Sequence, residues 1–189
     1  MKAFAGFKAE APARKEQLPA GGYIAKIMDA KEIGYDWGNV LLISFDIAEG
    51  EYKDFFAKDY RNQQQEDKKW RGTFRLRIPK DDGSEKDGWS KKSFNNAMWA
   101  VEASNTGYHW DWNETGLKGK TVGVLYRNKE WEMNGNTGWF TECCALTDAE
   151  EIRKGSFKMP KDKPLKKELS SSGDSFIDID ASELGDLPF

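Results

Sequence analysis

The sequence predicts a mainly β fold with five strands, a helix inserted between the third and fourth strands, and a short helix after the fifth. Three observations predict it. Alternating apolar and polar residues recur between short turn signals, one window has the 3.6-residue period of a helix, and an Asn-Gly pair separates two late strand patterns. The chain has 189 residues, which suffices for one substantial domain with an appendage.

The first three strands are expected near the start of the chain. Residues 23–33 and 40–48 alternate between apolar and polar side chains, with a turn of Tyr, Asp, Trp, Gly and Asn at 35–39 between them. This two-residue period is typical of half-buried strands. A second turn at 49–51 precedes residues 52–60, which we expect to form the third strand.

The middle of the chain combines an extended segment with a helix. Residues 70–79 alternate arginine with apolar side chains and predict a short amphipathic strand or an extended arm. A polar turn follows at 81–88. Residues 90–104 predict a helix, because their apolar side chains recur at i, i+3, i+4 and i+7. These apolar positions are Phe94, Ala97, Met98 and Val101.

Two more strands and a short helix are expected before residue 156. Residues 118–131 and 138–146 have strand patterns, and the Asn134-Gly135 pair between them is a strong hairpin signal. A capping box that begins at Thr147 predicts a helix of about two turns. Gly155 is a suitable C-terminal stop for it.

Three strands, an insertion that contains a helix, and a final hairpin follow one another in the order of the five-stranded OB-fold barrel. We therefore expect an OB-fold domain over residues 19–156. A flexible N-terminal arm is expected over 1–18, and a linker rich in lysine, proline and serine over 157–175. Residues 176–189 carry too little apolar surface to order themselves, so they predict a disordered acidic tail.

Composition excludes several classes of protein. Apolar residues make up 38% of the chain, and no run approaches the ~20 apolar residues of a membrane span. The first residues lack the apolar core of a secretory signal, so we expect the cytoplasm of a bacterial host or a phage-infected cell. The only cysteines, Cys143 and Cys144, are adjacent, which fits a reducing compartment and leaves no CxxC metal motif.

Catalytic chemistry has little support in the sequence. His109 is the only histidine, and no glycine-rich phosphate loop is present. The acidic residues at 81–87 and 109–114 are interpreted as surface loops, with a metal-dependent nuclease kept as an alternative. We therefore expect a non-enzymatic protein that needs no cofactor or bound metal.

Charge is unevenly distributed along the chain. The net charge is −3, but residues 168–189 hold six acidic side chains and no basic one. The remainder therefore has a net charge of +3, and within it residues 58–92 hold eleven Lys or Arg against seven Asp or Glu. A mildly basic body with an acidic tail indicates that the body has an anionic partner.

Aromatic residues are the other unusual component, at 13% of the chain with eight Trp. Proteins bind single-stranded nucleic acid by stacking bases on rings and by placing cations along the phosphates. In an OB barrel this surface comprises strands two and three and the loops after strands one and four. Phe45, Phe94 and Phe140 are assigned to the core. The residues expected to contact DNA are Tyr35, Trp37, Tyr52, Phe56, Lys58, Tyr60, Trp70, Arg71, Phe74, Arg75, Arg77, Arg127, Lys129, Trp131 and Trp139.

The acidic tail ends in apolar residues that a purely solubilising tail does not need. Leu187, Pro188 and Phe189 lie beside a free carboxylate, after a stretch whose charges are all negative. Such a segment can act as a ligand, because its acids steer it to a basic surface while the ring and carboxylate enter a pocket. The residues expected to bind a partner are Asp178, Asp180, Glu183, Asp186, Leu187, Pro188 and Phe189.

This ending resembles the acidic C-terminal tip of bacterial and phage single-stranded DNA-binding proteins, which ends in Asp, a hydrophobic residue, Pro and Phe. The body is similar to that family in the order of its elements, and residues 116–120 and 150–155 resemble phage-encoded members. In the family, an OB body binds the strand and the tip recruits replication and repair proteins. The resemblance implies sequence-independent binding of single-stranded DNA in replication, recombination or repair, with such partner proteins and without a membrane.

Two other classes of function remain open from the residues alone. Carbohydrate-binding modules also use Trp platforms on sheets, and an aromatic-rich adaptor would use exposed rings as a protein interface. The sequence does not decide between a monomer and a homo-oligomer.

Overall fold

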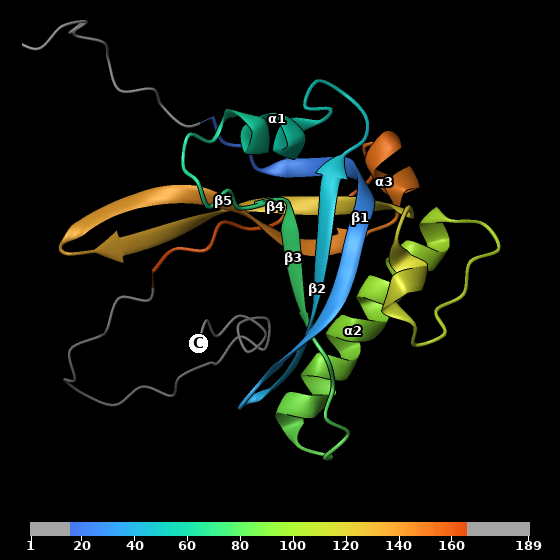
Figure 1. The fold of residues 1–189 in the computed structure, drawn as a ribbon. Coiled ribbons are helices and arrows are strands. Elements are labelled where there is room, and N and C mark those ends of the chain that lie inside the picture. Colours follow the sequence, from blue (N-terminus) through green and yellow to red (C-terminus); the bar gives the residue numbers. More distant parts are fainter. Residues whose placement is uncertain (1–15, 166–189) are drawn as a thin grey trace, which may run out of the picture.

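The computed structural model describes residues 16–165 (Figure 1). The acidic segment and its predicted partner-binding residues lie outside this range. The elements in chain order are β1 (Gly21–Tyr35), β2 (Gly38–Ile47), α1 (Phe55–Asn62), β3 (Thr73–Arg77), α2 (Glu85–Ser104), the 3₁₀ helix η1 (Glu114–Leu117), β4 (Thr121–Met133), β5 (Asn136–Thr147) and α3 (Ala149–Arg153).

The five strands form one antiparallel sheet in the order β3-β2-β1-β4-β5, so the predicted mainly β fold with five strands is confirmed. β1 is central and long. Its first part pairs with β4, from Gly21 to Lys26, and its second part pairs with β2, from Ala25 to Tyr35. The two parts overlap at Ala25 and Lys26, and a register shift between Ile27 and Asp29, within the part that pairs with β2, bends the strand. Among the described residues no ladder joins β3 to β5, so the sheet is not closed by hydrogen bonds.

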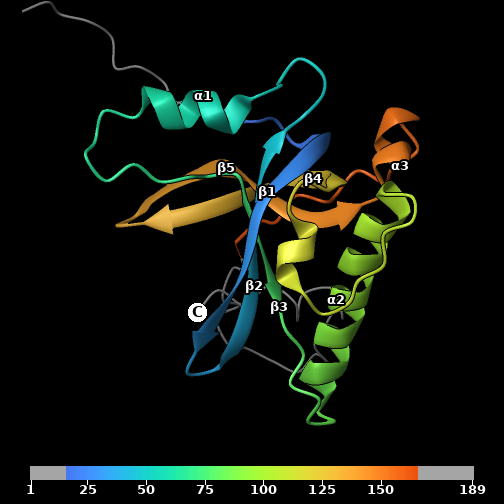
Figure 2. The ribbon, with the colours of Figure 1, turned by 45° about the vertical axis from the view of Figure 1, so that its right-hand side comes forward.

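Two long hairpins extend away from the body of the sheet (Figure 1). The β4–β5 hairpin points to the left of the view, and the tip of the β1–β2 hairpin points downward. α1 lies at the end of the sheet that is opposite to the β1–β2 tip. α2 runs along one side of the sheet, on the right in Figure 2. The predicted Asn134-Gly135 turn joins β4 to β5, and both of its residues have positive φ, as a tight hairpin turn requires.

The core lies between the inner face of the sheet and α2. Strand residues that alternate along β2, β3 and β4 are buried there, and so is the apolar stripe of α2. Each large side chain contributes about 1.5–3 kcal/mol on burial. The main contributors are Ile27, Ile43, Phe45, Leu76, Phe94, Val101, Val122 and Val124.

The expected third strand at 52–60 is wrong: this segment contains α1, and the third strand is the later β3. The cause is a contact distant in sequence. The buried carboxylate of Asp46 accepts the backbone N–H groups of Phe56 and Ala57 at 2.9 and 3.0 Å, which satisfies two donors of the first helical turn. The ring of Phe56 then packs into the core against Phe45.

α2 begins earlier than the predicted helix over 90–104. Ser84 caps it by accepting the backbone N–H of Asp87 at 3.2 Å, so half of the expected polar turn at 81–88 is helical. The carboxylate of Asp87 also accepts the backbone N–H groups of Lys80 and Asp81, at 2.8 and 3.0 Å. These bonds fix the β3–α2 loop against the helix.

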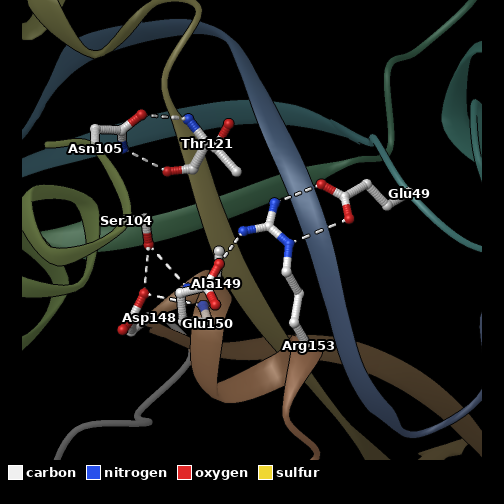
Figure 3. A network of polar contacts seen from close by, with 8 residues as sticks. All are labelled: Glu49, Ser104, Asn105, Thr121, Asp148, Ala149, Glu150 and Arg153. Atoms are coloured by element: carbon white, nitrogen blue, oxygen red, sulfur yellow. Dashed lines mark hydrogen bonds and ion pairs between the residues drawn. The ribbon is translucent and has the colours of Figure 1, made fainter.

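Polar contacts fasten the C-terminal end of α2 to β4 and α3 (Figure 3). The side-chain amide of Asn105 donates to the carbonyl of Thr121 at 2.7 Å and accepts the backbone N–H of the same residue at 3.0 Å. Ser104 accepts the backbone N–H of Ala149 at 2.9 Å, the first residue of α3. α3 is shorter than the predicted two turns, and its cap is Asp148.

Both ends of the described chain are attached to the sheet. Leu18 is buried in the core although it belongs to the segment expected to be a flexible arm. At the other end, Lys163 pairs with the free edge of β4: its N–H donates to Asn128 and its carbonyl accepts from Glu130, at 2.8 and 2.9 Å. We call residues 161–165 the strap. None of the described helices combines the length and hydropathy needed to cross a bilayer.

Candidate functional site

The outer face of the sheet, which points away from α2, carries the arginines predicted for β3. Residues that lie directly opposite each other in an antiparallel pair share a face. Thr73, Arg75 and Arg77 lie opposite Ser44, Leu42 and Val40 of β2. Their neighbours Phe74 and Leu76 are buried on the inner face. The predicted alternation of this segment is therefore confirmed, and Phe74 faces the core with only 9% of its surface exposed.

The tip of the β1–β2 hairpin brings two predicted rings and one predicted arginine together. Tyr35 and Trp37 stack with ring centroids 5.1 Å apart and planes 9° from parallel, and each residue is 37% exposed. The guanidinium carbon of Arg77 lies 4.9 Å from the centroid of the Trp37 ring. This cation–π contact holds the charge of Arg77 at the hairpin tip.

The β4–β5 hairpin presents a similar combination on its outer face. Arg127, Lys129 and Trp131 follow one another at every second position of β4, opposite to the buried Val124 and Tyr126. The Nζ of Lys129 lies 5.8 Å from the ring centroid of Phe140 on β5. Phe140 is half-buried, so its assignment to the core is wrong.

Glu142 offsets part of the positive charge of this hairpin. Its carboxylate accepts hydrogen bonds from Arg127 at 2.9 and 3.1 Å and from Lys129 at 3.0 Å. Glu142 therefore bridges the two cations and neutralises part of their charge. The indole of Trp131 covers Gly138, where a Cβ would lie 2.9 Å from the ring, so the ring lies flat on the strand beside it.

A trough of about 370 Å³ lies between the edge of β3 and the edge of β5, where the sheet is open. Arg71, Thr73 and Arg75 line one side, while Phe140 and Glu142 line the other. We call this feature the seam trough. Two cations and a ring from segments about 70 residues apart in the chain thus border one groove.

The floor of the seam trough is uncharged. It includes Tyr126, Cys143 and Cys144. Burial raises the pKa of the Cys143 thiol well above its ordinary value, and burial likewise raises the pKa of the Tyr126 hydroxyl. Both groups are therefore neutral at pH 7, and the charge of the groove comes from its walls.

A second group of predicted residues lies at α1, away from the hairpin tips. Phe56 is buried, which excludes it from DNA contact, and this prediction is wrong. The indole N–H of Trp70 donates to the carbonyls of Phe45 and Gly72, both at 3.1 Å, so its ring is held against the backbone at this end of the sheet. Tyr60 lies 5.9 Å from that ring.

The other predicted residues near α1 have structural partners as well. Tyr52 packs edge-on against Tyr23 and Phe55. Lys58 is exposed and donates to the carbonyl of Lys53 at 2.9 Å. Arg71 pairs with Asp59 at 3.0 Å while also lining the seam trough. Of this group, only Arg71 reaches the outer-face groove.

Trp139 lies on the opposite face of β5 from Phe140, and it is 49% exposed. It therefore does not share the surface that carries Trp131 and Lys129. The sequence prediction placed Trp131 and Trp139 on one surface because both lie near the same turn. Successive side chains of a strand point to opposite faces, and this alternation separates the two rings.

Two strongly exposed rings were missed by the sequence analysis. Trp99 is 57% exposed on α2, and Trp112 is 73% exposed in the loop after α2. Trp112 has φ 64°, which is unusual for a bulky residue, and its ring stacks on Phe94 with centroids 5.6 Å apart. The helical pattern could have identified Trp99, because it lies opposite the apolar stripe of α2.

Comparison with known proteins adds no family assignment. No family model matches the sequence, and no curated protein matches it. Within residues 16–165, no group of three or more His, Cys, Asp or Glu side chains is arranged to hold a metal ion.

Proposed function

We propose that this protein binds single-stranded DNA without reading its sequence and protects the strand during replication, recombination or repair, in a bacterial or phage setting. It acts without catalysis. The observation that carries the proposal is the presence of rings beside cations at both hairpins: Trp37 with Arg77 at the β1–β2 tip, and Phe140 with Lys129 on the β4–β5 hairpin.

This arrangement suits an unpaired strand for a physical reason. A single strand exposes base faces and phosphates at the same time, and each stacked base contributes about 1–3 kcal/mol. Rings alone would suit sugars or apolar peptides, and cations alone would suit any anion. The outer face supplies both kinds of group along one groove, and its two exposed hairpins extend the surface beyond the sheet.

We further propose that the sheet is an OB-type barrel that is open between β3 and β5. The order of strands and the helix between β3 and β4 support this assignment. In that fold, ligands bind across strands two and three and the loops after strands one and four. Arg75, Arg77, Trp37 and Trp131 occupy the corresponding elements.

The acidic segment 178–189 is proposed to recruit replication or recombination proteins. Its apolar end and free carboxylate are suited to a pocket with hydrogen-bond donors. Deletion of residues 178–189 is expected to leave DNA affinity unchanged or increased, because the four acidic side chains that it removes oppose binding to a polyanion. The same deletion should abolish co-purification of partners. A weaker affinity for DNA after deletion would contradict this role.

A fluorescence titration tests the DNA proposal directly. Intrinsic Trp emission is followed while oligo-dT is added at about 50 mM salt and again at about 200 mM. We expect quenching at low salt, with log K falling by about 0.7 per phosphate contact per log unit of salt. A W37F variant assigns the part of the signal that arises at the hairpin tip. Emission that stays constant at low salt, together with no gel shift, would overturn the proposal.

An aromatic-rich adaptor is the second candidate, and one observation favours it. Trp99 and Trp112 are exposed without belonging to the outer-face groove. Large exposed apolar side chains often mark protein interfaces. A stable complex with another protein, in the absence of any binding to nucleic acid, would support this function over DNA binding.

A further inference from the structure

A second cavity, of about 230 Å³, lies between the tip of the β1–β2 hairpin and the first turn of α2. Trp37 and Gly38 line it from the hairpin, and Arg77 lines it from the end of β3. Lys80 comes from the loop after β3, and Lys86 from α2. We call this feature the tip pocket. Arg77 of this pocket lies on the same face of β3 as Arg75, which lines the seam trough.

The tip pocket keeps a positive charge. Arg77, Lys80 and Lys86 supply three cations, and Asp82 and Asp87 supply two anions. The Nζ of Lys91 lies 3.0 Å from the Asp87 carboxylate and also pairs with Asp81, so one cation is shared by two anions. With Lys91 and Asp81 included, four cations face three anions, and a net charge of +1 remains.

Asp87 serves to hold the pocket in shape. Besides its contact with Lys91, it accepts the backbone N–H groups of Lys80 and Asp81. The hydrogen bond from Lys91 is the main reason that the pKa of Asp87 lies below its ordinary value. The carboxylate therefore stays ionised at neutral pH and keeps the loop that carries Lys80 beside the helix.

The hairpin tip is fitted closely to this loop. Gly38 has φ 142°, and a Cβ there would lie 2.9 Å from Cε of Lys80. A larger residue would push Lys80 away from the hairpin or would strain the backbone. The Trp37 ring and the three cations are thus brought together by backbone that only glycine allows.

We infer that the tip pocket holds one nucleotide unit of the bound strand, with its phosphate among Arg77, Lys80 and Lys86 and its base beside Trp37. This inference rests on the proposed function. The size supports a single unit, because the volume is below the ~300–1,000 Å³ of pockets that enclose larger ligands. The chemistry supports a nucleotide, because converging cations suit a phosphate while an indole suits a base.

Charge removal at the pocket tests the phosphate contact. The double variant K80A/K86A removes two exposed side chains that line the pocket. Binding is measured for dT oligomers of about 4 to 16 nucleotides, the site sizes of single OB folds. We expect about a tenfold weaker affinity at low salt and a salt slope reduced by about 1.4, the value for two contacts at ~0.7 each.

The matched control is K118A/K154A, which makes the same change in net charge at two exposed lysines outside the pocket. It should bind as the wild type does, and unchanged circular dichroism should show that both variants fold. If K80A/K86A and the control have the same affinity and salt slope, the pocket is overturned while the DNA proposal stands. If the wild type itself fails to bind dT, the proposed function fails.

The position of the base needs a separate readout. The indole N–H resonance of Trp37 is assigned by its absence from W37F, and its chemical shift is followed as dT is added to the wild type. We expect a large shift, which becomes small for an abasic oligomer of equal length. Equal shifts with dT and with the abasic oligomer would overturn the placement of the base.

Discussion

Two regions of this protein contain the same kinds of residue but use them differently. At the β1–β2 tip, Trp37 stacks on Tyr35 and carries Arg77 against its ring, and it remains 37% exposed. Near α1, Trp70 donates its indole N–H to two carbonyls, and Phe56 is buried in the core against Phe45. The comparison teaches that the environment of each ring, more than the basic residues near it in sequence, decides its role.

The largest expected effect is a loss of stability on mutation of Phe56, near α1, without a loss of DNA binding. F56A should lower the free energy of unfolding by about 3–5 kcal/mol, because it removes a large buried ring and leaves a cavity. Urea denaturation followed by circular dichroism measures the change. The affinity of the folded variant for dT should stay at the wild-type value. A folded F56A protein that no longer bound DNA would return α1 to the candidate interface.

The next effect concerns binding. W37A should weaken dT binding by about 1–3 kcal/mol, the contribution of one stacked base, with little change in thermal stability. W99A is the matched control, since Trp99 is more exposed but lies on α2, outside the groove. An equal loss of dT affinity in W37A and W99A would contradict a specific role of the hairpin tip in DNA binding.

Trp70 offers a smaller test of the same comparison. W70F keeps a ring but removes the N–H group that donates to Phe45 and Gly72, so stability should fall by about 0.5–1.5 kcal/mol. The dT affinity should not change, because this ring does not line the seam trough. Equilibrium unfolding and a parallel titration check both statements.

A single arginine should produce a change seen mainly in the salt dependence. R75A removes one cation from the wall of the seam trough and should lower the slope of log K against log salt by about 0.7. R61A, on α1, is the control and should retain the wild-type slope. An unchanged slope in R75A would argue that this wall does not contact phosphate.

The smallest effect is a pH dependence at the tip pocket. The pKa of Asp87 is lowered mainly by its hydrogen bond with Lys91, so the ionised form is favoured in the folded state. The resulting stability is present above the ordinary carboxyl pKa of about 4 and is lost as the pH falls through the lowered folded value. D87N should therefore be less stable than wild type at pH 7, and the difference should shrink below about pH 4. A constant difference down to pH 2.5, measured by thermal unfolding, would contradict this role.

Much of the fold could be predicted because its signals are local. The alternation in β2, the Asn134-Gly135 turn and the apolar stripe of α2 all lie within short windows of sequence. α1 could not be predicted in this way, because the carboxylate that satisfies its first turn belongs to Asp46 on β2. α1 has only eight residues, which is too few for its pattern to be told from that of a strand without this distant contact.

For the candidate site too, local patterns could be predicted from the sequence and tertiary contacts could not. Strand parity placed Arg75 and Arg77 on the outer face correctly, because a two-residue period follows from the backbone alone. The exposure of each ring could not be obtained from parity, since it depends on which distant segment covers it. The burial of Phe56 and the exposure of Trp112 both follow from such tertiary contacts.

The strap has a practical consequence for shortening the chain. Lys163 covers main-chain donors and acceptors of β4 that would otherwise form an open sheet edge, and such edges promote association between molecules. A shortened protein that ends before residue 161 would uncover this edge and would aggregate for reasons unrelated to recruitment. A cut placed after Leu165 preserves it. Cargo fused downstream of Leu165 would be anchored at the β4–β5 hairpin, next to the groove that is proposed to carry the strand.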